Sequence, residues 1–457
     1  MTTIFDPFVL RNNPAMRGRM LAILEAALDA VRPDLAVRAQ LHRSGSELWV
    51  AGAQIDLAAC RRIFVLGAGK AGAPMTQAVE EVLGDRITGG LVVVKEGHGG
   101  PTRHVELVEA GHPVPTEAAL AAGARVLSLA HAAEAGDLVL IVLSGGGSAL
   151  LEATGVGLAD LQALTAALLA CGATIGEINC LRKHLSLIKG GQLARAVYPA
   201  RLVTLVLSDV VGSPLDVIAS GPTVPDPTTW ADAWRIVAKY NLAARLPPAV
   251  VSHLQAGLAG TIPDTPKPGA PEFAGSQVVV VGDNRVAAEA AVRRAQALGY
   301  NSLLLTTFVE GEAKEVALVV AALAKEIIAS GHPLALPACL VLGGETTVTL
   351  SGSTGLPPGK GGRNQELALA AALALDGVSS ICVASLATDG SDGPTDSAGG
   401  IVDGGTVGRG AALERSAASA LHHHDAYPYL EATADLLRSG PTHTNVNDLT
   451  IILVDHP

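Results

Sequence analysis

The sequence predicts an α/β protein of two domains, the first with a mainly parallel sheet between layers of helices. Apolar strand segments alternate with helical segments along the whole chain, which is typical of that class. At 457 residues the chain is also too long for one ordinary core. Apolar residues make up 49% but aromatic residues only 3%, so Ala, Val and Leu must fill a core of stacked layers.

Charge and composition exclude several classes of function. The formal net charge of −11 and the absence of a clustered basic segment argue against nucleic acid as a partner, whereas a small anion needs only a few local cations. No uncharged apolar stretch reaches membrane-spanning length and no signal peptide begins the chain, so we expect a cytoplasmic protein without a membrane partner. The five cysteines form no CxxC pair, which argues against a zinc site or a disulfide framework.

The segment Asp137 to Leu151, DLVLIVLSGGGSALL, carries the strongest local signal. Its apolar run predicts a doubly buried parallel strand, and three glycines follow at once. Glycine backbone N–H groups can converge on an anion, and a helix that starts near Ser148 would direct its positive end to the same point. The pattern predicts a phosphate or carboxylate site, although a tight turn without a ligand fits it equally well. The residues of this expected site are Ser144, Gly145, Gly146, Gly147 and Ser148.

An earlier strand, turn and helix contain a second glycine motif, RRIFVLGAGKAG. Gly67, Gly69 and Gly72 satisfy GxGxxG, so a dinucleotide-binding dehydrogenase is a rival interpretation. The next strand ends in Lys95 where a ribose-binding acid is wanted, although Glu96 follows it. A lysine inside the turn, Lys70, suits a transferring phosphoryl group better than a bare turn.

The remaining segments of the first domain continue the alternation. We expect an amphipathic helix over 16–31 to cover the sheet, strands over 91–94 and 105–108, and helices that reach residue 131 and span 158–169. The segment 179–191 carries four basic side chains, and such a segment alone is more often a solvated face than an anion site. The strand 201–208 ends in Asp209, a candidate metal ligand or base, although a simple turn explains this residue almost as well.

A Pro- and Gly-rich stretch over 257–276 predicts the boundary between domains 1–260 and 275–457. The second half restarts with a strand at 277–283, and then alternates helices and strands to residue 350. It also carries three polar, glycine-flanked clusters, for which a shared cleft is the better interpretation. Their charged residues are Glu345, then Lys360, Arg363 and Glu366, then Asp389, Asp392 and Asp396.

These motifs resemble the class II glycerate 2-kinases, a two-domain family whose C-terminal part is called the MOFRL domain. The resemblance covers almost the whole chain and departs at Ser213, where the family often has an acid, and at His443, where it often has glycine. It rests on GAGKA (67–71), GHPVP (111–115), LSGGGSALL (143–151), RKHLSLIKGG (182–191), LSDVVG (207–212), IASGPTVPD (218–226), GGETTV (343–348), GGRNQEL (361–367), TDGSDGPTD (388–396) and TNVNDL (444–449).

The resemblance implies a Rossmann-like αβα domain with a mainly parallel sheet, followed by a MOFRL-type α/β domain with a mixed sheet. It also implies phosphoryl transfer from ATP to D-glycerate, with Mg²⁺, in a cleft between the domains, to give 2-phosphoglycerate. Lys70 and Arg363 match the family's catalytic lysine and arginine. Our hypothesis adds Asp209 as a catalytic residue, and Asp209 with Asp389 as ligands of Mg²⁺. The other expected contacts are Gly67, Gly69, the Ser144–Ser148 loop and Lys189 for phosphate, and Glu345, Asn364 and Asn447, with Arg363, for the substrate.

Two other functions stay open at this point. Family members have also been described as hydroxypyruvate reductases, and the GxGxxG match fits an NAD(P)-dependent enzyme of that kind. A sugar-acid or nucleotide sensor without turnover is the third interpretation. The sequence leaves the oligomeric state open, a homo-oligomer included.

Overall fold

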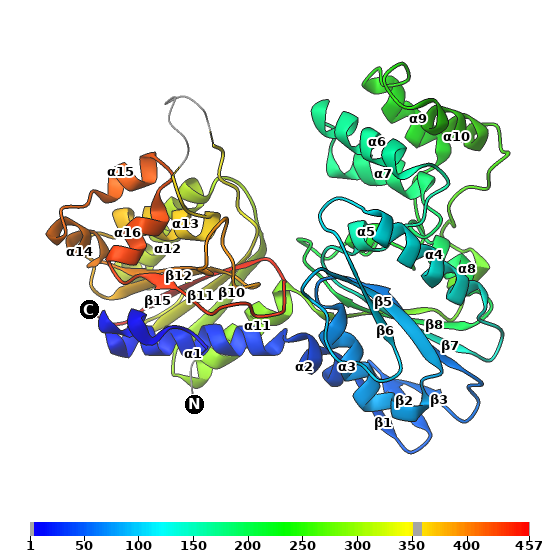
Figure 1. Cartoon of the computed structure of the whole chain (residues 1–457). Coiled ribbons are helices and arrows are strands. Elements are labelled where there is room, and N and C mark those ends of the chain that lie inside the picture. The colour runs from blue at the N-terminus through cyan, green and yellow to red at the C-terminus, as the bar shows by residue number, and fades with distance from the viewer. Residues whose placement is uncertain (1–3, 351–358, 457) are drawn as a thin grey trace. The chain divides into compact units, whose positions relative to one another are not determined.

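The computed structural model describes residues 4–350 and 359–456 and divides them into two compact units (Figure 1). One unit consists of residues 33–281, and the other joins residues 1–32 to residues 282–457. The expected division at 260–275 therefore differs from the compact units, both in the position of the boundary and in the membership of the N-terminal helix. In the described part of the chain, no helix is long and apolar enough to cross a membrane.

Unit 33–281 is built on a six-stranded sheet in the order β6-β5-β4-β7-β8-β9. The pairs β6/β5, β5/β4, β4/β7 and β7/β8 are all parallel, as the sequence predicts. The central strand β7 is buried along its whole length, which explains its unbroken apolar sequence. The strands are β4 (Ile63–Ala68), β5 (Gly89–Lys95), β6 (Glu106–Ala110), β7 (Leu138–Leu143), β8 (Arg201–Leu207) and β9 (Gln277–Gly282).

Helices follow these strands, and a separate helical cluster packs on its own small core of Leu, Val and Trp side chains. The sheet-associated helices are α3 (Gly72–Leu83), α4 (Glu117–His131), α5 (Gly147–Leu150) and α8 (Gln192–Val197). The cluster comprises α6 (Leu158–Ala170), α7 (Ile175–Leu185), α9 (Trp230–Lys239) and α10 (Pro248–Leu258). The unit also contains α2 (Pro33–Gln40), the antiparallel meander β1 (Leu41–Ser44), β2 (Glu47–Val50) and β3 (Ala53–Asp56), and the 3₁₀ turns η2 (Gly84–Arg86), η3 (Ile218–Ser220) and η4 (Pro271–Phe273).

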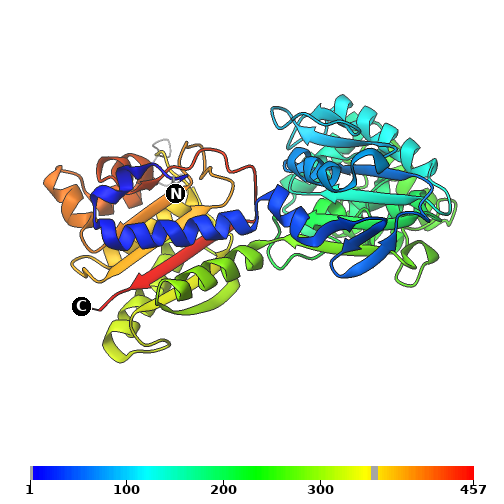
Figure 2. The same ribbon diagram turned by 90° about the horizontal axis from the view of Figure 1, so that it is seen from below.

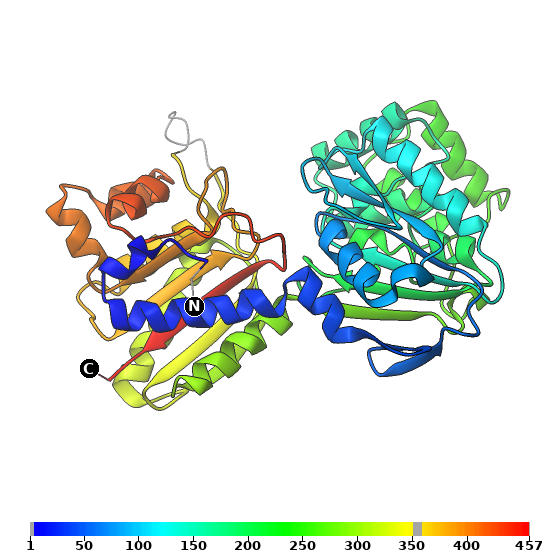
Figure 3. The same ribbon diagram turned by 60° about the horizontal axis from the view of Figure 1, so that its bottom comes forward.

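The other unit contains a mixed sheet in the order β10-β11-β15-β12-β13-β14 (Figure 3). Only β10 and β11 are parallel, and the last strand of the chain, β15, lies between β11 and β12. This confirms the expected mixed sheet. Its strands are β10 (Asn301–Val309), β11 (Ala338–Gly344), β12 (Ile381–Ala387), β13 (Gly399–Asp403), β14 (Leu436–Leu437) and β15 (Asp448–Val454).

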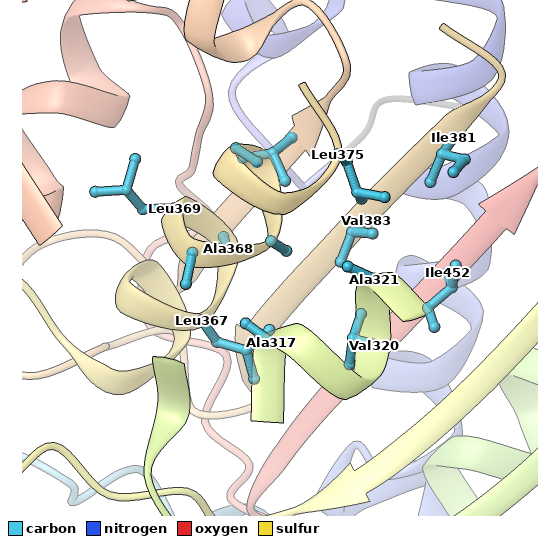
Figure 4. Packing of buried hydrophobic residues seen from close by; sticks show 14 of the residues in the cluster. Ala317, Val320, Ala321, Leu367, Ala368, Leu369, Leu375, Ile381, Val383 and Ile452 are labelled. Atoms are coloured by element: carbon cyan, nitrogen blue, oxygen red, sulfur yellow. The ribbon is translucent and has the colours of Figure 1, made fainter. Parts of the chain in front are cut away.

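Helices cover both faces of this sheet. Figure 2 shows α1 (Pro14–Ala30) alongside α11 (Asn284–Ala297), and Figure 4 shows α12 (Ala313–Ser330) and α13 (Arg363–Ala374) packing their Ala and Leu side chains on β12 and β15. Small alanines let these helices approach the sheet closely, so few aromatic residues are needed. The remaining helices are η1 (Pro7–Arg11), α14 (Thr406–Ala412), α15 (Ala417–His422) and α16 (Ala426–Ala432).

Two sequence predictions about element placement were wrong. Helix α1 does not cover the parallel sheet, because it packs with the mixed sheet, where the fully buried Arg17 lies 2.6 Å from both Asp403 and Asp435. The strand at 277–283 does not open the second sheet, because β9 forms the edge of the parallel sheet beside β8. An apolar helix face and an apolar strand suit either sheet, so their sequences alone do not choose between the two.

Candidate active site

The first two GxGxxG glycines, Gly67 at the end of β4 and Gly69 just after it, pack closely on β7 and on the residue that follows it, Ser144. Gly67 has φ +156°, and a Cβ added there would lie 2.0 Å from the carbonyl oxygen of Val142. Gly69 has φ +142°, and its Cβ would lie 2.1 Å from the Ser144 hydroxyl oxygen. Close strand packing therefore accounts for both glycines without a nucleotide. This weakens the expected phosphate contacts of Gly67 and Gly69.

Two hydrogen bonds join this turn to the SGGGS loop, which we define as residues 144–148. The Lys70 N–H donates to the Gly145 carbonyl oxygen at 2.9 Å, and the Ala71 N–H donates to the Ser144 Oγ at 3.0 Å. Both loops follow neighbouring parallel strands, so they lie at the sheet edge where α/β proteins commonly bind ligands. Ser144 is 1% exposed, so its hydroxyl serves the turn rather than a ligand.

The side chains of Asp209, His112 and Lys70 lie beside the glycines of the SGGGS loop. A Cβ added to Gly145 would lie 2.0 Å from Asp209 Oδ2, and one added to Gly146, which has φ +85°, would lie 3.0 Å from His112 Cδ2 and 3.5 Å from Lys70 Cγ. The fold therefore brings together Lys70, Asp209 and the loop, as the sequence predicts for residues at the ends of β4, β7 and β8. His112, from the GHPVP motif, was not among the expected site residues.

The expected helix after the loop is short. Helix α5 has four residues and begins at Gly147, so its dipole contributes less than that of a long helix. The Ser148 Oγ lies 2.9 Å from the Ser220 Oγ, which already gives that hydroxyl a partner. Backbone N–H groups of the glycines are thus better candidates for anion contacts than a helix dipole.

In unit 33–281, the side chain of Lys70 is the clearest candidate for contact with an anionic ligand. Its side chain is half-buried, and no carboxylate of the described residues lies within 4 Å of its ammonium group. Its carbonyl oxygen lies 3.0 Å from Nδ1 of His98, so that nitrogen donates the hydrogen bond. A half-buried cation without a counter-ion, beside glycine N–H groups, is suited to an anionic ligand.

The His112 ring is neutral over most of the physiological pH range. Burial lowers the pKa of His112 to about 4, and the nearby positive charge of Lys70 acts in the same direction. A neutral imidazole beside the loop can donate or accept a hydrogen bond without adding charge.

The basic segment 179–191 is not a solvated face. Its basic side chains are buried or half-buried, and each contacts different partners. Lys183 lies 3.2 Å from Asp216 and 3.4 Å from Asp226, and its side chain is 3% exposed. His184 is also buried and contacts Asp264. Arg182, which was not among the expected site residues, donates from Nη2 to the Ser148 carbonyl oxygen at 2.8 Å.

Lys189 does not fit its expected role as a phosphate ligand. Its side chain is fully buried, and its ammonium group lies 2.6 Å from Glu152 and 3.0 Å from the Leu151 carbonyl oxygen. The structure therefore gives Lys189 an internal ion pair. No signal in the sequence revealed this burial.

In the other unit, Arg363 is the first residue of α13 and is held between two acids. Its Nε lies 2.5 Å and its Nη2 2.9 Å from the two carboxylate oxygens of Asp448, and its Nη1 lies 2.9 Å from Glu345. These acids raise the pKa of the guanidinium even though burial opposes them. The Arg363 side chain remains 33% exposed, so one side of it can still meet a ligand.

The expected substrate residues of this unit divide into two groups. Asn447 has φ +67°, and its Nδ2 donates to Glu345 at 2.8 Å, so these two residues join Arg363 in one cluster. Asn364 is 1% exposed, and it donates to Asp392 and accepts a 2.7 Å hydrogen bond from Ser385. Asn364 therefore supports the fold and does not fit a direct substrate contact.

Asp392 fixes the start of α13. Its two carboxylate oxygens accept hydrogen bonds from the N–H groups of Asn364 and Gln365, at 3.1 and 2.8 Å. Burial raises the pKa of Asp392 to about 6 although these hydrogen bonds oppose the shift. The carboxylate thus caps the helix that carries Arg363.

The structure offers limited support for the expected Mg²⁺ ligands. Asp209 belongs to unit 33–281 and Asp389 to the other unit, where its Oδ1 accepts a 2.9 Å hydrogen bond from the Ser391 N–H. Among the described residues, no group of three or more His, Cys, Asp or Glu side chains is arranged to hold a metal. Mg²⁺ that arrives with a nucleotide needs only one or two carboxylates, and the half-buried Asp209 beside the loop fits that requirement.

Comparison with known proteins identifies the family. Residues 19–255 match a domain of unknown function (DUF4147), and residues 338–448 match the MOFRL family. The chain is 39% identical to a glycerate 2-kinase of Pyrococcus horikoshii, over 95% of this chain and 96% of the relative. It is 40% identical to a D-glycerate 2-kinase of Thermotoga maritima, over 99% of this chain and 100% of the relative. The chain belongs to the glycerate kinase family.

A solved structure agrees with this assignment. The crystal structure of a glycerate kinase from Thermotoga maritima matches with a TM-score of 0.86 and 40% identity, over 96% of this chain and all of that one. Another relative, from Agrobacterium vitis, is named provisionally as a hydroxypyruvate reductase. It is 44% identical over 86% of this chain and 87% of the relative. Ser213 and His443, the two positions where the sequence departs from the family's motifs, both have a left-handed backbone, with φ +51° and +60°.

Proposed function

We propose that this protein transfers the γ-phosphoryl group of ATP to D-glycerate and forms 2-phosphoglycerate and ADP, with Mg²⁺ as the cofactor. The relatives with 39–40% identity over nearly their whole length are named glycerate 2-kinases, which supports the reaction class. The observation that carries the proposal is the half-buried Lys70 side chain at the SGGGS loop, whose ammonium group has no carboxylate within 4 Å among the described residues.

Phosphoryl transfer requires little covalent chemistry from the protein. The enzyme must bring the γ-phosphate and the acceptor hydroxyl into line and neutralise charge on the transferring oxygens. Backbone N–H groups of Gly145 and Gly146 are suited to hold phosphate oxygens, whereas the Gly147 N–H already donates to the Ser144 carbonyl oxygen at 3.2 Å. The Lys70 ammonium group is suited to stabilise the charge that develops during transfer.

Asp209 is the acid adjacent to the SGGGS loop, and we assign proton acceptance to it. The acceptor hydroxyl of glycerate loses its proton to the Asp209 carboxylate as the new O–P bond forms and the bond to ADP breaks. Asp209 is also the residue best suited to hold Mg²⁺ on the nucleotide, and Asp389 is a second candidate. Bound Mg²⁺ neutralises phosphate charge.

Arg363 suits an anionic group of the substrate, since its planar fork matches a carboxylate or phosphoryl group. An incoming anion would compete with Glu345, the more exposed of its two acidic partners, whose side chain is 43% exposed. That Lys70 and Arg363 act on one bound substrate, in a cleft shared by the two domains, stays a prediction.

A hydroxypyruvate reductase is the second candidate, because relatives from Agrobacterium vitis carry that provisional name. The GxGxxG turn supplies weaker support than its sequence suggests, since close packing on Val142 explains Gly67 and close packing on Ser144 explains Gly69. Strand β5 also ends at Lys95, where an NAD-binding fold commonly needs an acid.

The product separates the proposed reaction from its alternatives. Purified protein, incubated with ATP, Mg²⁺ and D-glycerate, should give a phosphate ester whose ³¹P signal is split into a doublet by the single proton on the middle carbon. A triplet would mean transfer to the terminal hydroxyl, and would refute the 2-phosphate product. Oxidation of NADH by hydroxypyruvate without any glycerate-dependent ester would favour the reductase, and binding without either reaction would favour a sensor.

A further inference from the structure

We infer that Arg182 is a second anion-binding cation of the SGGGS loop and contacts a phosphoryl or carboxylate group of the bound substrates. Arg182 lies on α7, next to α5 in Figure 1, and its guanidinium donates to the carbonyl oxygen of Ser148. Lys70 donates its N–H to Gly145 near the other end of the same loop. The inference rests on the proposed function and adds a residue to its site.

The Arg182 charge has no ion-pair partner in the described part of the chain. No carboxylate lies within 4 Å of its guanidinium, and its Nε is buried without a hydrogen-bond acceptor. Its Nη1 also makes no hydrogen bond there. A half-buried guanidinium with a single carbonyl partner retains several unused donors.

The surrounding charges do not neutralise Arg182. The neighbouring acid is Glu152, which is 1% exposed and already pairs at 2.6 Å with the fully buried Lys189. Burial lowers the pKa of Lys189 to about 8, and Arg182 adds to that shift while Glu152 opposes it. Within the part of the chain that the structure describes, Lys189 and Arg182 therefore share one carboxylate, and one positive charge beside the loop remains uncompensated.

An uncompensated, partly buried charge destabilises a protein unless a ligand compensates it. Burial lowers the pKa of the Arg182 guanidinium, which reflects the same unfavourable surroundings. A phosphoryl or carboxylate group at the loop would supply the missing charge. Arg182 is thus better explained by ligand binding than by its single contact with Ser148.

The test measures anion binding without turnover. Titration calorimetry with inorganic tripolyphosphate and, separately, with D-glycerate would compare the full-length wild type with Arg182→Gln and Arg182→Lys. The matched control is Arg201→Gln, which makes the same change in charge. Arg201 is exposed and lies at the first residue of β8, at the end of the strand opposite to the one that leads to Asp209. Arg182→Gln should lower the affinity for at least one of the two anions by about tenfold or more, which is the smallest loss expected when a charge-assisted hydrogen bond is removed. Arg182→Lys should recover part of that affinity.

Loss of tripolyphosphate affinity would assign Arg182 to the nucleotide phosphates, and loss of glycerate affinity to the substrate carboxylate. Without an anion, the melting temperature of Arg182→Gln should equal or exceed that of the wild type, because an uncompensated charge is removed. Unchanged affinity for both anions in Arg182→Gln, or in Arg182→Lys if the first variant does not fold, would overturn the inference. Arg182-dependent tripolyphosphate binding without any glycerate-dependent ADP would instead refute the proposed reaction and leave the inference standing.

Discussion

The main-chain N–H of Lys70 donates a 2.9 Å hydrogen bond to the carbonyl oxygen of Gly145, and thereby fixes the turn after β4 to the loop after β7. The lysine backbone is thus rigid while its ammonium group has no acidic partner among the residues described. A fixed backbone and an available cation are what electrostatic catalysis of phosphoryl transfer needs.

Lys70→Ala tests this role. Loss of an electrostatic contact made mainly in the transition state typically lowers the rate by about 10²–10³. We expect a decrease in kcat of at least that order with little change in melting temperature, since the Lys70 ammonium group makes no ion pair with any residue that the structure describes. The control is Lys325→Ala, an exposed lysine on α12, which should retain full turnover. Near-normal kcat in Lys70→Ala would remove this residue from the mechanism.

Gly145→Ala tests the position of Asp209. The added methyl group would lie 2.0 Å from Asp209 Oδ2, so the carboxylate must move. A displacement of about 1 Å at a reacting group can lower the rate by about 10²-fold. The control is Gly89→Ala in β5, whose added methyl group meets no atom within 4 Å. Equal kcat values for the two variants would contradict a catalytic role for Asp209 in its present position.

Arg363→Ala should lower kcat by about 10²–10³ and also destabilise the fold by about 1–3 kcal/mol, because Asp448 loses its main partner. The Asp448 side chain is 8% exposed, and burial raises its pKa. The double variant Arg363→Ala/Asp448→Asn no longer contains the buried, unpaired carboxylate. Its melting temperature should therefore lie above that of Arg363→Ala, whereas its kcat should stay as low. Recovery of turnover along with stability would make Arg363 a structural residue only.

The lowered pKa of His112 predicts that the protein becomes less stable as the pH falls below about 6.5. Its pKa is about 4 in the folded protein, below the ordinary value of 6.5, so the unfolded chain binds the proton more tightly. The contribution of the neutral ring to stability is complete above about pH 6.5 and is lost as the pH falls towards 4. Melting temperatures of His112→Asn between pH 4 and 7 should therefore depend less on pH than those of the wild type. The exposed His131 on α4 supplies the control, and His131→Asn should follow the wild type.

The sequence predicted the central strand and the SGGGS loop because both depend on local chemistry. An unbroken apolar run must be buried on two faces, and three consecutive glycines permit the tight contacts with Asp209 and His112. Parallel strands then bring their carboxyl ends to one edge, so the proximity of Lys70 and Asp209 followed from the predicted topology.

Burial and pairing between distant segments were not predictable in the same way. Lys189 and Arg182 lie in one basic segment, yet the first is buried in an ion pair with Glu152 and the second has no ion-pair partner among the described residues. Arg363 lies 85 residues from its partner Asp448 in the sequence. Similarly, the buried pairing of Arg17 on α1 with Asp403 decided which sheet this helix covers. Such pairings depend on the complete tertiary structure.

The most direct test is ADP release by the purified protein with ATP and Mg²⁺, measured with and without D-glycerate in the wild type and Lys70→Ala. The account predicts ADP formation that requires glycerate in the wild type and falls by at least about 10²-fold in the variant. Wild-type protein that releases no glycerate-dependent ADP, or a variant that releases it at the wild-type rate, would contradict the account.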